Sequence, residues 1–170
     1  MEEREQRRIF DEWLSRHKGL LFKVVHAYGF TSHDRDDLFQ EIATQVWNSI
    51  PRFRAESAVT TWLYRVALNS ALAWSRKERK HRDQTQALED YEPALRDTSR
   101  VQDRQLGWLY EQIAQLDHVD RSLTLLFLDG YSYREMAETL GISESYVGVK
   151  INRIKTHLKN LTKEELHHGL

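Results

Sequence analysis

Cysteine is absent from the 170-residue sequence, and helix-interrupting residues are scarce, with two prolines and seven glycines. Without cysteine the chain can form neither disulfides nor thiolate metal sites, which fits a reducing compartment. Alanine, leucine, glutamate, arginine and glutamine are frequent, and these residues favour helices over a turn-rich sheet. We therefore expect an all-α fold.

Long apolar runs are missing as well. No stretch approaches the roughly 18 consecutive apolar residues of a membrane span. The charged start, MEEREQRRIF, lacks the apolar segment of a signal peptide. We expect no membrane insertion and a cytoplasmic location.

A strong net charge is also missing, since the formal value of −1 taken alone argues against a nucleic-acid binder. The charges are nevertheless clustered. Residues 76–82 read RKERKHR, residues 150–159 carry four basic side chains and no acid, and the stretch between them at 83–103 is acidic. This pattern indicates two basic faces and an acidic connector, although charged runs are often only solvated helix faces.

Apolar spacing predicts three helices in the first half of the chain. Residues 9–28 carry an apolar stripe at spacings of three and four, residues 36–50 follow the N-cap candidates Thr31, Ser32 and Asp34, and a third helix runs from about 60 to beyond 76. We expect residues 1–82 to form a first domain, a bundle of three to four helices.

The periodicity fades after residue 82 and resumes near 101. We therefore expect a flexible linker at 83–103 and a second domain at 104–165, with two short helices separated near residues 117–120. The polar tail, residues 162–170, is expected to fray.

A helix-turn-helix is predicted near the C-terminal end. Ser132 and Glu135 have the spacing of a capping box, Gly141 suits a tight turn, and Ser143 caps a second helix with an apolar stripe. Its opposite face carries side chains that suit the major groove, because Arg and Lys pair with guanine or phosphate and Asn with adenine. An ordinary helical hairpin with a solvated basic face is the alternative. The expected DNA-reading residues are Ser143, Glu144, Ser145, Tyr146, Gly148, Val149, Lys150, Asn152, Arg153 and Lys155.

Gly148 is costly in a helix interior, by about 1 kcal/mol relative to Ala. We interpret it as a residue that permits close approach of DNA.

The first domain has two further features. DLFQE at 37–41 places carboxylates and an amide on a polar helix face that could meet a basic protein, although exposed acids often serve only solvation. TWLYRVALN at 61–69 mixes aromatic, basic and amide groups ahead of the basic run, which suits unstacked bases, although Trp62 could equally be core.

Together these motifs resemble the sigma factors of bacterial RNA polymerase, specifically the short extracytoplasmic-function class that keeps only regions two and four. DLFQEIATQVW is similar to region 2.2, FRAESAVTTWLYRVALN to regions 2.3 and 2.4, and GYSYREMAETLGISESYVGVKINRIKTHL to region 4.2. Departures from the family pattern at Ala73, Ser75, Asp117 and Gly148 leave promoter details open.

The resemblance implies a role for each motif. It implies promoter recognition and strand opening for a specialised regulon, with no catalytic residue, metal or cofactor. Implied partners are promoter DNA and core polymerase, through its beta-prime clamp helices and beta flap, and an anti-sigma factor stays open; the free chain is expected to be monomeric. The residues implied to bind polymerase are Asp37, Leu38, Gln40, Glu41 and Trp47. The residues implied to bind the minus-ten element and its upstream phosphates are Phe53, Arg54, Glu56, Ser57, Trp62, Tyr64, Arg65, Asn69, Arg76, Lys77, Arg79 and Lys80.

Two rival functions are weaker. A dimeric DNA-binding regulator leaves DLFQE and residues 62–69 unexplained, and an enzyme would need histidines paired with acids or a nucleophile beside a base, which the sequence does not offer.

Overall fold

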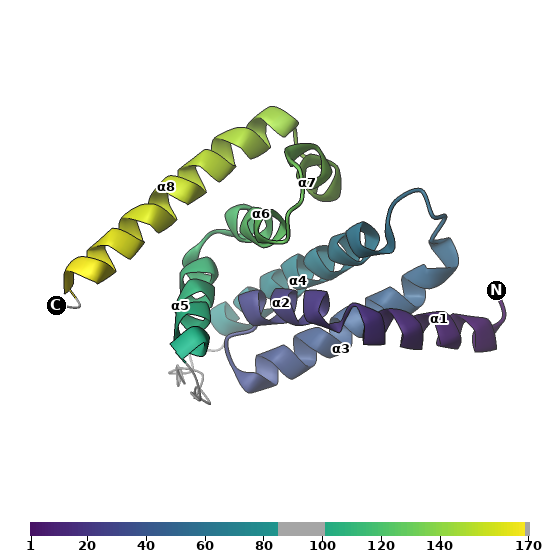
Figure 1. Cartoon of the computed structure of the whole chain (residues 1–170). Coiled ribbons are helices and arrows are strands. Elements are labelled where there is room, and N and C mark those ends of the chain that lie inside the picture. The colour runs from purple at the N-terminus through teal and green to yellow at the C-terminus, as the bar shows by residue number, and fades with distance from the viewer. Residues whose placement is uncertain (85–100, 169–170) are drawn as a thin grey trace. The chain divides into compact units, whose positions relative to one another are not determined.

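The computed structural model describes residues 1–84 and 101–168 and contains eight α-helices and one 3-10 helix in those ranges (Figure 1). The expectation of an all-α fold with two helical units is confirmed. The chain divides into unit 1, Met1–Ser99, and unit 2, Arg100–Leu170. The predicted linker at 83–103 lies largely outside the described residues, and the predicted domain limits stay predictions. No helix within the described ranges is long and apolar enough to span a membrane.

Unit 1 is built from α1 (Glu3–Arg16), α2 (Lys18–Tyr28), α3 (Ser32–Ser49), the 3-10 helix η1 (Ile50–Arg52) and α4 (Val59–Gln84). Helices α2, α3 and α4 contact one another and enclose the core, whereas α1 packs on α3 and η1. The core residues of α2, α3 and α4 are Leu21, Val24, Val25, Tyr28, Leu38, Ile42, Val46, Leu63, Ala67, Leu68 and Ala71.

The prediction of one helix over residues 9–28 is wrong. At His17 the backbone leaves helical geometry, with φ −114° and ψ 20°, and the chain continues as a separate helix. The cause is packing, because α1 lies on α3 and η1 whereas α2 lies mainly on α4 and α3. A continuous apolar stripe in the sequence therefore serves two different surfaces.

The start of α3 is capped as its sequence suggests. The Thr31 hydroxyl accepts a hydrogen bond from the Asp34 N–H at 3.0 Å, and the Asp34 carboxylate accepts one from the Thr31 N–H at 3.2 Å. Pro51 follows within η1, where its missing N–H costs nothing at the first turn.

Unit 2 contains α5 (Val101–Gln115), α6 (His118–Leu128), α7 (Tyr133–Leu140) and α8 (Glu144–His168). Helix α8 contacts both α6 and α7. The core residues of unit 2 are Ile113, Leu123, Leu125, Leu126, Met136, Ala137, Val147, Ile151 and Ile154.

The predicted helix-turn-helix is confirmed in its local geometry. The Ser132 hydroxyl accepts from the Glu135 N–H at 3.2 Å, and the Glu135 carboxylate accepts from the Ser132 N–H at 2.7 Å. Gly141 has φ +68° and ends α7 in the left-handed conformation, and the Ser143 hydroxyl accepts from the Tyr146 N–H at 3.1 Å.

The expected fraying of residues 162–170 is wrong for most of that segment, because α8 continues to His168. The Thr162 hydroxyl donates to the Leu158 carbonyl at 2.9 Å, and Lys163, Glu164 and Glu165, which follow, are good helix formers.

Candidate nucleic-acid interface

The outer face of α8 lies opposite its apolar stripe, as the sequence predicts. Val147, Ile151 and Ile154 are buried, whereas Tyr146 and Val149 are 43% and 52% exposed. The other predicted reading residues that are exposed are Ser143, Glu144, Ser145, Asn152, Arg153 and Lys155. Hydroxyl, amide, aromatic and cationic groups thus share one accessible surface of unit 2.

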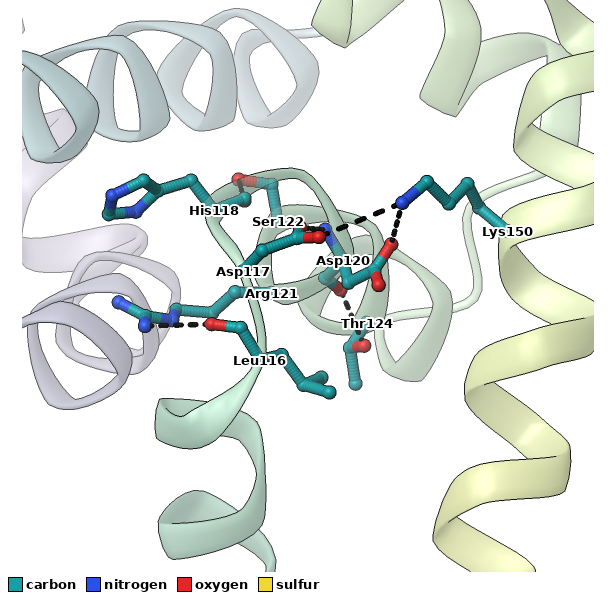
Figure 2. A network of polar contacts seen from close by, with 8 residues as sticks. All are labelled: Leu116, Asp117, His118, Asp120, Arg121, Ser122, Thr124 and Lys150. Carbon is teal, nitrogen blue, oxygen red and sulfur yellow. Dashed lines mark hydrogen bonds and ion pairs between the residues drawn. The ribbon is translucent and has the colours of Figure 1, made fainter.

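Lys150 differs from the rest of this set. Its side chain is only 15% exposed, and its Nζ lies 3.0 Å from Asp120 Oδ1 on α6 and 3.7 Å from Oδ2 of Asp117, the N-cap of α6 (Figure 2). The hydrogen bond to Asp120 raises the pKa of Lys150, so the ammonium stays charged at neutral pH. Sequence reasoning placed Lys150 on the DNA-facing surface, although its spacing from Val147 and Ile154 puts it on the packed side of α8. Its partner Asp120 is 30 residues earlier, and helical spacing gives no sign of that pairing.

Gly148 lies beside α7. A Cβ built at this position would be 3.7 Å from Tyr133 Cε2 and 3.8 Å from Tyr133 Cδ2, which is ordinary van der Waals contact. The absence of a side chain at Gly148 therefore affects the contact with α7 as well as the approach of DNA, because a side chain here would contact the Tyr133 ring.

The loop before α4 is held by three aromatic rings. Phe53 contacts Trp13 and Trp62 with ring centroids 5.1 and 5.3 Å apart, and Trp13 and Trp62 are themselves 5.3 Å apart. Trp62 is half-buried in this cluster, so its ring packs against its neighbours and is also partly accessible. Sequence reasoning missed Trp13 as a support for this loop, because only the packing of α1 brings the ring there.

The middle of the loop carries the predicted base-capturing residues. Arg54 and Glu56 are exposed and Ser57 is half-buried. Ala55 between them has φ +55°, the left-handed region that non-glycine residues rarely adopt.

On α4 the predicted residues divide by helix face. Asn69 is exposed and Arg65 is half-buried. Tyr64 is 0% exposed, so the expectation that it lies near a melting surface is corrected: its ring belongs to the interior. The cations predicted to hold phosphates, Arg76, Lys77, Arg79 and Lys80, are all exposed.

The polar face of α3 presents Asp37, Gln40 and Glu41, which are all exposed. Asp37 Oδ2 lies 3.3 Å from His33 Nε2, and Glu41 accepts a hydrogen bond from the Gln45 amide at 3.0 Å. Leu38 is 0% exposed and belongs to the core, so its predicted contact with polymerase is corrected.

Trp47 is half-buried at the far end of α3. Its ring meets Phe10 edge to face with centroids 5.5 Å apart, and its carbonyl accepts from the Gln6 amide at 2.7 Å. A pocket of about 410 Å³ adjoins it, lined by Arg7, Phe10, Asp11, Ala43, Thr44 and Trp47. This pocket extends the accessible surface of α3 onto α1.

A metal centre finds no support in the part of the chain that the structure describes. Histidine and acidic side chains do not gather there in groups of three or more that could hold an ion.

Known proteins resemble both units. The family descriptions "Sigma-70 region 2" and "Sigma-70, region 4" match residues 13–81 and 106–158. The chain is 30% identical over 161 residues to the ECF RNA polymerase sigma factor SigM of Mycobacterium tuberculosis, covering 91% of this chain and 78% of that protein. It is 32% identical over 146 residues to the ECF RNA polymerase sigma factor SigX of Bacillus subtilis, covering 77% of this chain and 73% of that protein.

A solved structure shares the fold. The sigma factor RpoE of Bartonella quintana, solved in complex with the anti-sigma factor NepR, gives a TM-score of 0.72 at 19% identity and covers 92% of this chain and 98% of that one. With two family regions in order and a 30% identical relative covered over most of its length, the chain belongs to the ECF sigma factors of RNA polymerase.

Proposed function

We propose that this chain binds core RNA polymerase, carries it to a defined class of promoters and promotes strand opening there through the surfaces described above. The observation that carries the proposal is the presence, on one chain, of a capped helix-turn-helix with an accessible polar face and of a second unit with an aromatic-anchored loop. In this role the chain is a non-enzymatic initiation subunit, and its binding to RNA polymerase places it in the cytoplasm.

The polymerase-docking surface lies on α3. Asp37, Gln40 and Glu41 are exposed and suit the basic side of a partner helix, and they would meet the beta-prime clamp helices. Trp47 borders this surface through the pocket shared with α1. The beta flap is the second contact on core polymerase, made by unit 2.

The minus-ten surface combines the loop and the outer side of α4. Flipping a base from the duplex costs a few kcal/mol, so a pocket that already has its shape lowers the barrier to opening. The Phe53 anchor with Trp13 and Trp62 supplies that shape, while Arg54, Glu56, Ser57 and Asn69 offer hydrogen-bonding groups. Arg65 lies near the melted strands. The exposed cations Arg76, Lys77, Arg79 and Lys80 hold upstream phosphates.

The minus-thirty-five surface is the outer face of α8. Residues near the start of such a helix usually reach base edges, and later ones reach the backbone. Ser143, Glu144, Ser145, Tyr146 and Val149 would accordingly lie nearest the bases. Asn152, Arg153 and Lys155 follow along the groove.

The free chain is a monomer or is bound by an anti-sigma protein, and it uses no cofactor. Affinity divided between two DNA elements and a polymerase surface needs no strong net charge, which fits the formal value of −1.

Charge reversal on α3 tests the docking surface. Asp37→Lys with Glu41→Lys should lower binding to purified core polymerase at least tenfold, because a basic partner surface would then be repelled, while circular dichroism of the free chain stays unchanged. The matched control, Glu164→Lys with Glu165→Lys, changes the net charge equally on exposed residues of α8. Equal polymerase binding by both double variants would contradict the assignment of α3.

A further inference from the structure

The ion pairs of Lys150 connect two helices rather than two turns of one helix. Asp117 and Asp120 stand at the start of α6, where Asp117 is the N-cap and accepts from the Asp120 N–H at 2.8 Å (Figure 2). Side-chain exposure is 15% for Lys150 and 20% for Asp120, against 62% for Asp117. Asp120 is therefore the shielded partner and contributes more than Asp117, whose pairing is weakened by solvent.

The position of Lys150 on α8 explains its direction. It is three residues after Val147 and four before Ile154, so it lies on the same side of the helix as these buried residues. Asn152, Arg153 and Val149 are exposed on the other side. Lys150 thus stands at the edge of the packed face, within reach of α6.

The α6 end of this contact is itself fixed. The Arg121 guanidinium donates to the Leu116 carbonyl at 2.9 Å (Figure 2) and to the Ala114 carbonyl at 2.7 Å, and these bonds tie the first turn of α6 to the end of α5. Within α6, the Thr124 hydroxyl donates to the Asp120 carbonyl at 2.7 Å. The two carboxylates are therefore presented from a rigid base.

The apolar contacts between α6 and α8 do not define a rotation well. Burial of aliphatic side chains such as Val147, Ile151 and Ile154 is non-directional, so it stabilises the contact without a polar group to mark one rotation. The ion pair adds a distance requirement, because Lys150 Nζ reaches Asp120 Oδ1 at 3.0 Å only when this side of α8 faces the start of α6. The pair between Lys150 and Asp120 selects that rotation.

We propose that Lys150 is a positioning residue for promoter recognition: held by Asp120 and Asp117, it sets the rotation of α8 that turns Val149 toward the minus-thirty-five bases and Asn152 and Arg153 along the groove. It does not contact DNA itself. This inference rests on the proposed function and assigns a different role to one residue of that surface.

The test uses holoenzyme made from the full chain and core polymerase. The probe is a promoter duplex selected by the wild-type holoenzyme from a pool randomised over the minus-thirty-five element, compared with the same duplex scrambled there. The variants are Lys150→Met, Asp120→Asn, the double variant and Lys150→Arg. Arg153→Met, which removes an exposed cation from the same helix, is the matched control.

A positioning role predicts a specific set of results. Lys150→Met and Asp120→Asn each lower the ratio of affinities for selected and scrambled duplex about tenfold, within the range for one misplaced base contact. The double variant is no worse than either single one, and Lys150→Arg restores the ratio. The slope of log affinity against log salt is the same for Lys150→Met as for wild type, whereas it falls by about 0.9 for Arg153→Met if that side chain neutralises one phosphate.

A direct DNA contact predicts the opposite. Lys150→Met would then lower the salt slope by about 0.9, and Asp120→Asn would release the ammonium and leave the affinity ratio intact or raise it. Either result overturns the proposal.

A second measurement separates this inference from the proposed function. In the free chain, without DNA or polymerase, the unfolding free energies of the same two single variants and their double variant form a cycle. Non-additive losses support the ion pair as a link between the helices, and additive losses overturn the proposal. If the wild-type chain instead forms no promoter-selective holoenzyme while the cycle is non-additive, the proposed function fails and the link between α6 and α8 stands.

Discussion

Replacing Gly148 by alanine should stabilise unit 2. Glycine in a helix interior costs about 0.8–1.0 kcal/mol relative to alanine, and α8 is helical on both sides of this position. The added Cβ would lie 3.7 Å from the Tyr133 ring, which is ordinary contact and needs no rearrangement. The free energy of unfolding should therefore rise by about 1 kcal/mol, which corresponds to roughly 4–8 °C in Tm for a unit of this size.

Fluorotryptophan NMR on the full chain can follow this change in unit 2. Of the five tryptophans, Trp108 alone lies in unit 2, so its resonance reports unfolding there. Promoter binding by the holoenzyme should stay unchanged, because the new methyl group lies against Tyr133. A lower Tm would refute the packing argument. A tenfold loss of promoter affinity with a raised Tm would show instead that DNA approaches the backbone at Gly148.

Substitutions at four further residues test the local geometry of both units. Phe53→Ala removes two edge-to-face ring contacts worth about 0.5–1.5 kcal/mol each beyond the area they bury, so the loss for unit 1 in denaturant unfolding should exceed about 1–3 kcal/mol. Trp13→Ala should reduce the permanganate reactivity of melted minus-ten thymines, although Trp13 is outside the predicted DNA surface. Unchanged reactivity would exclude a supporting role for the ring cluster. Gly141→Ala should cost about 1–2 kcal/mol in thermal unfolding because of its φ of +68°, and an equal cost for Asn, which tolerates this region, would argue against a conformational cause. Hydrogen bonds from Ser132 lower the pKa of Glu135 below its ordinary value of 4.5, so the stability it adds is present above about pH 4.5 and is lost as pH falls through the lowered pKa. Glu135→Gln should flatten that part of the acid-unfolding curve, and a parallel curve would contradict the capping box.

Local features of the fold follow directly from the sequence. The capping box of α7 joins residues three positions apart, and the left-handed turn at Gly141 depends on that residue's own conformational freedom. The apolar stripe of α8 likewise repeats at helical spacing, so its buried and exposed faces are readable before any partner helix is known. Each of these features has its cause within a single helix and its cap.

Features that depend on distant parts of the chain are not readable in this way. The break at His17 follows from α1 and α2 packing on different surfaces, and the Lys150 pairing joins α8 to residues 30 positions earlier. Tyr64 belongs to a segment whose mixed aromatic and basic composition suggests a surface, yet its own position on α4 faces the interior. Composition identifies the segment, and only packing decides which of its side chains are accessible.

The assignment of these residues to surfaces of the polymerase and the promoter remains the proposal to be tested, whereas the family itself is established by the similarity of both regions. If the assignment of one residue fails, another residue makes that contact and the function of the chain is unchanged.

Run-off transcription is the most direct measurement of the central claim. Purified core polymerase should produce no specific transcript from a promoter of this chain's own regulon, and addition of the chain should start transcription at one defined position. The Asp37→Lys, Glu41→Lys variant should leave the template silent at equal concentration. A chain that never associates with core polymerase, or that binds it without starting a specific transcript, would contradict the account.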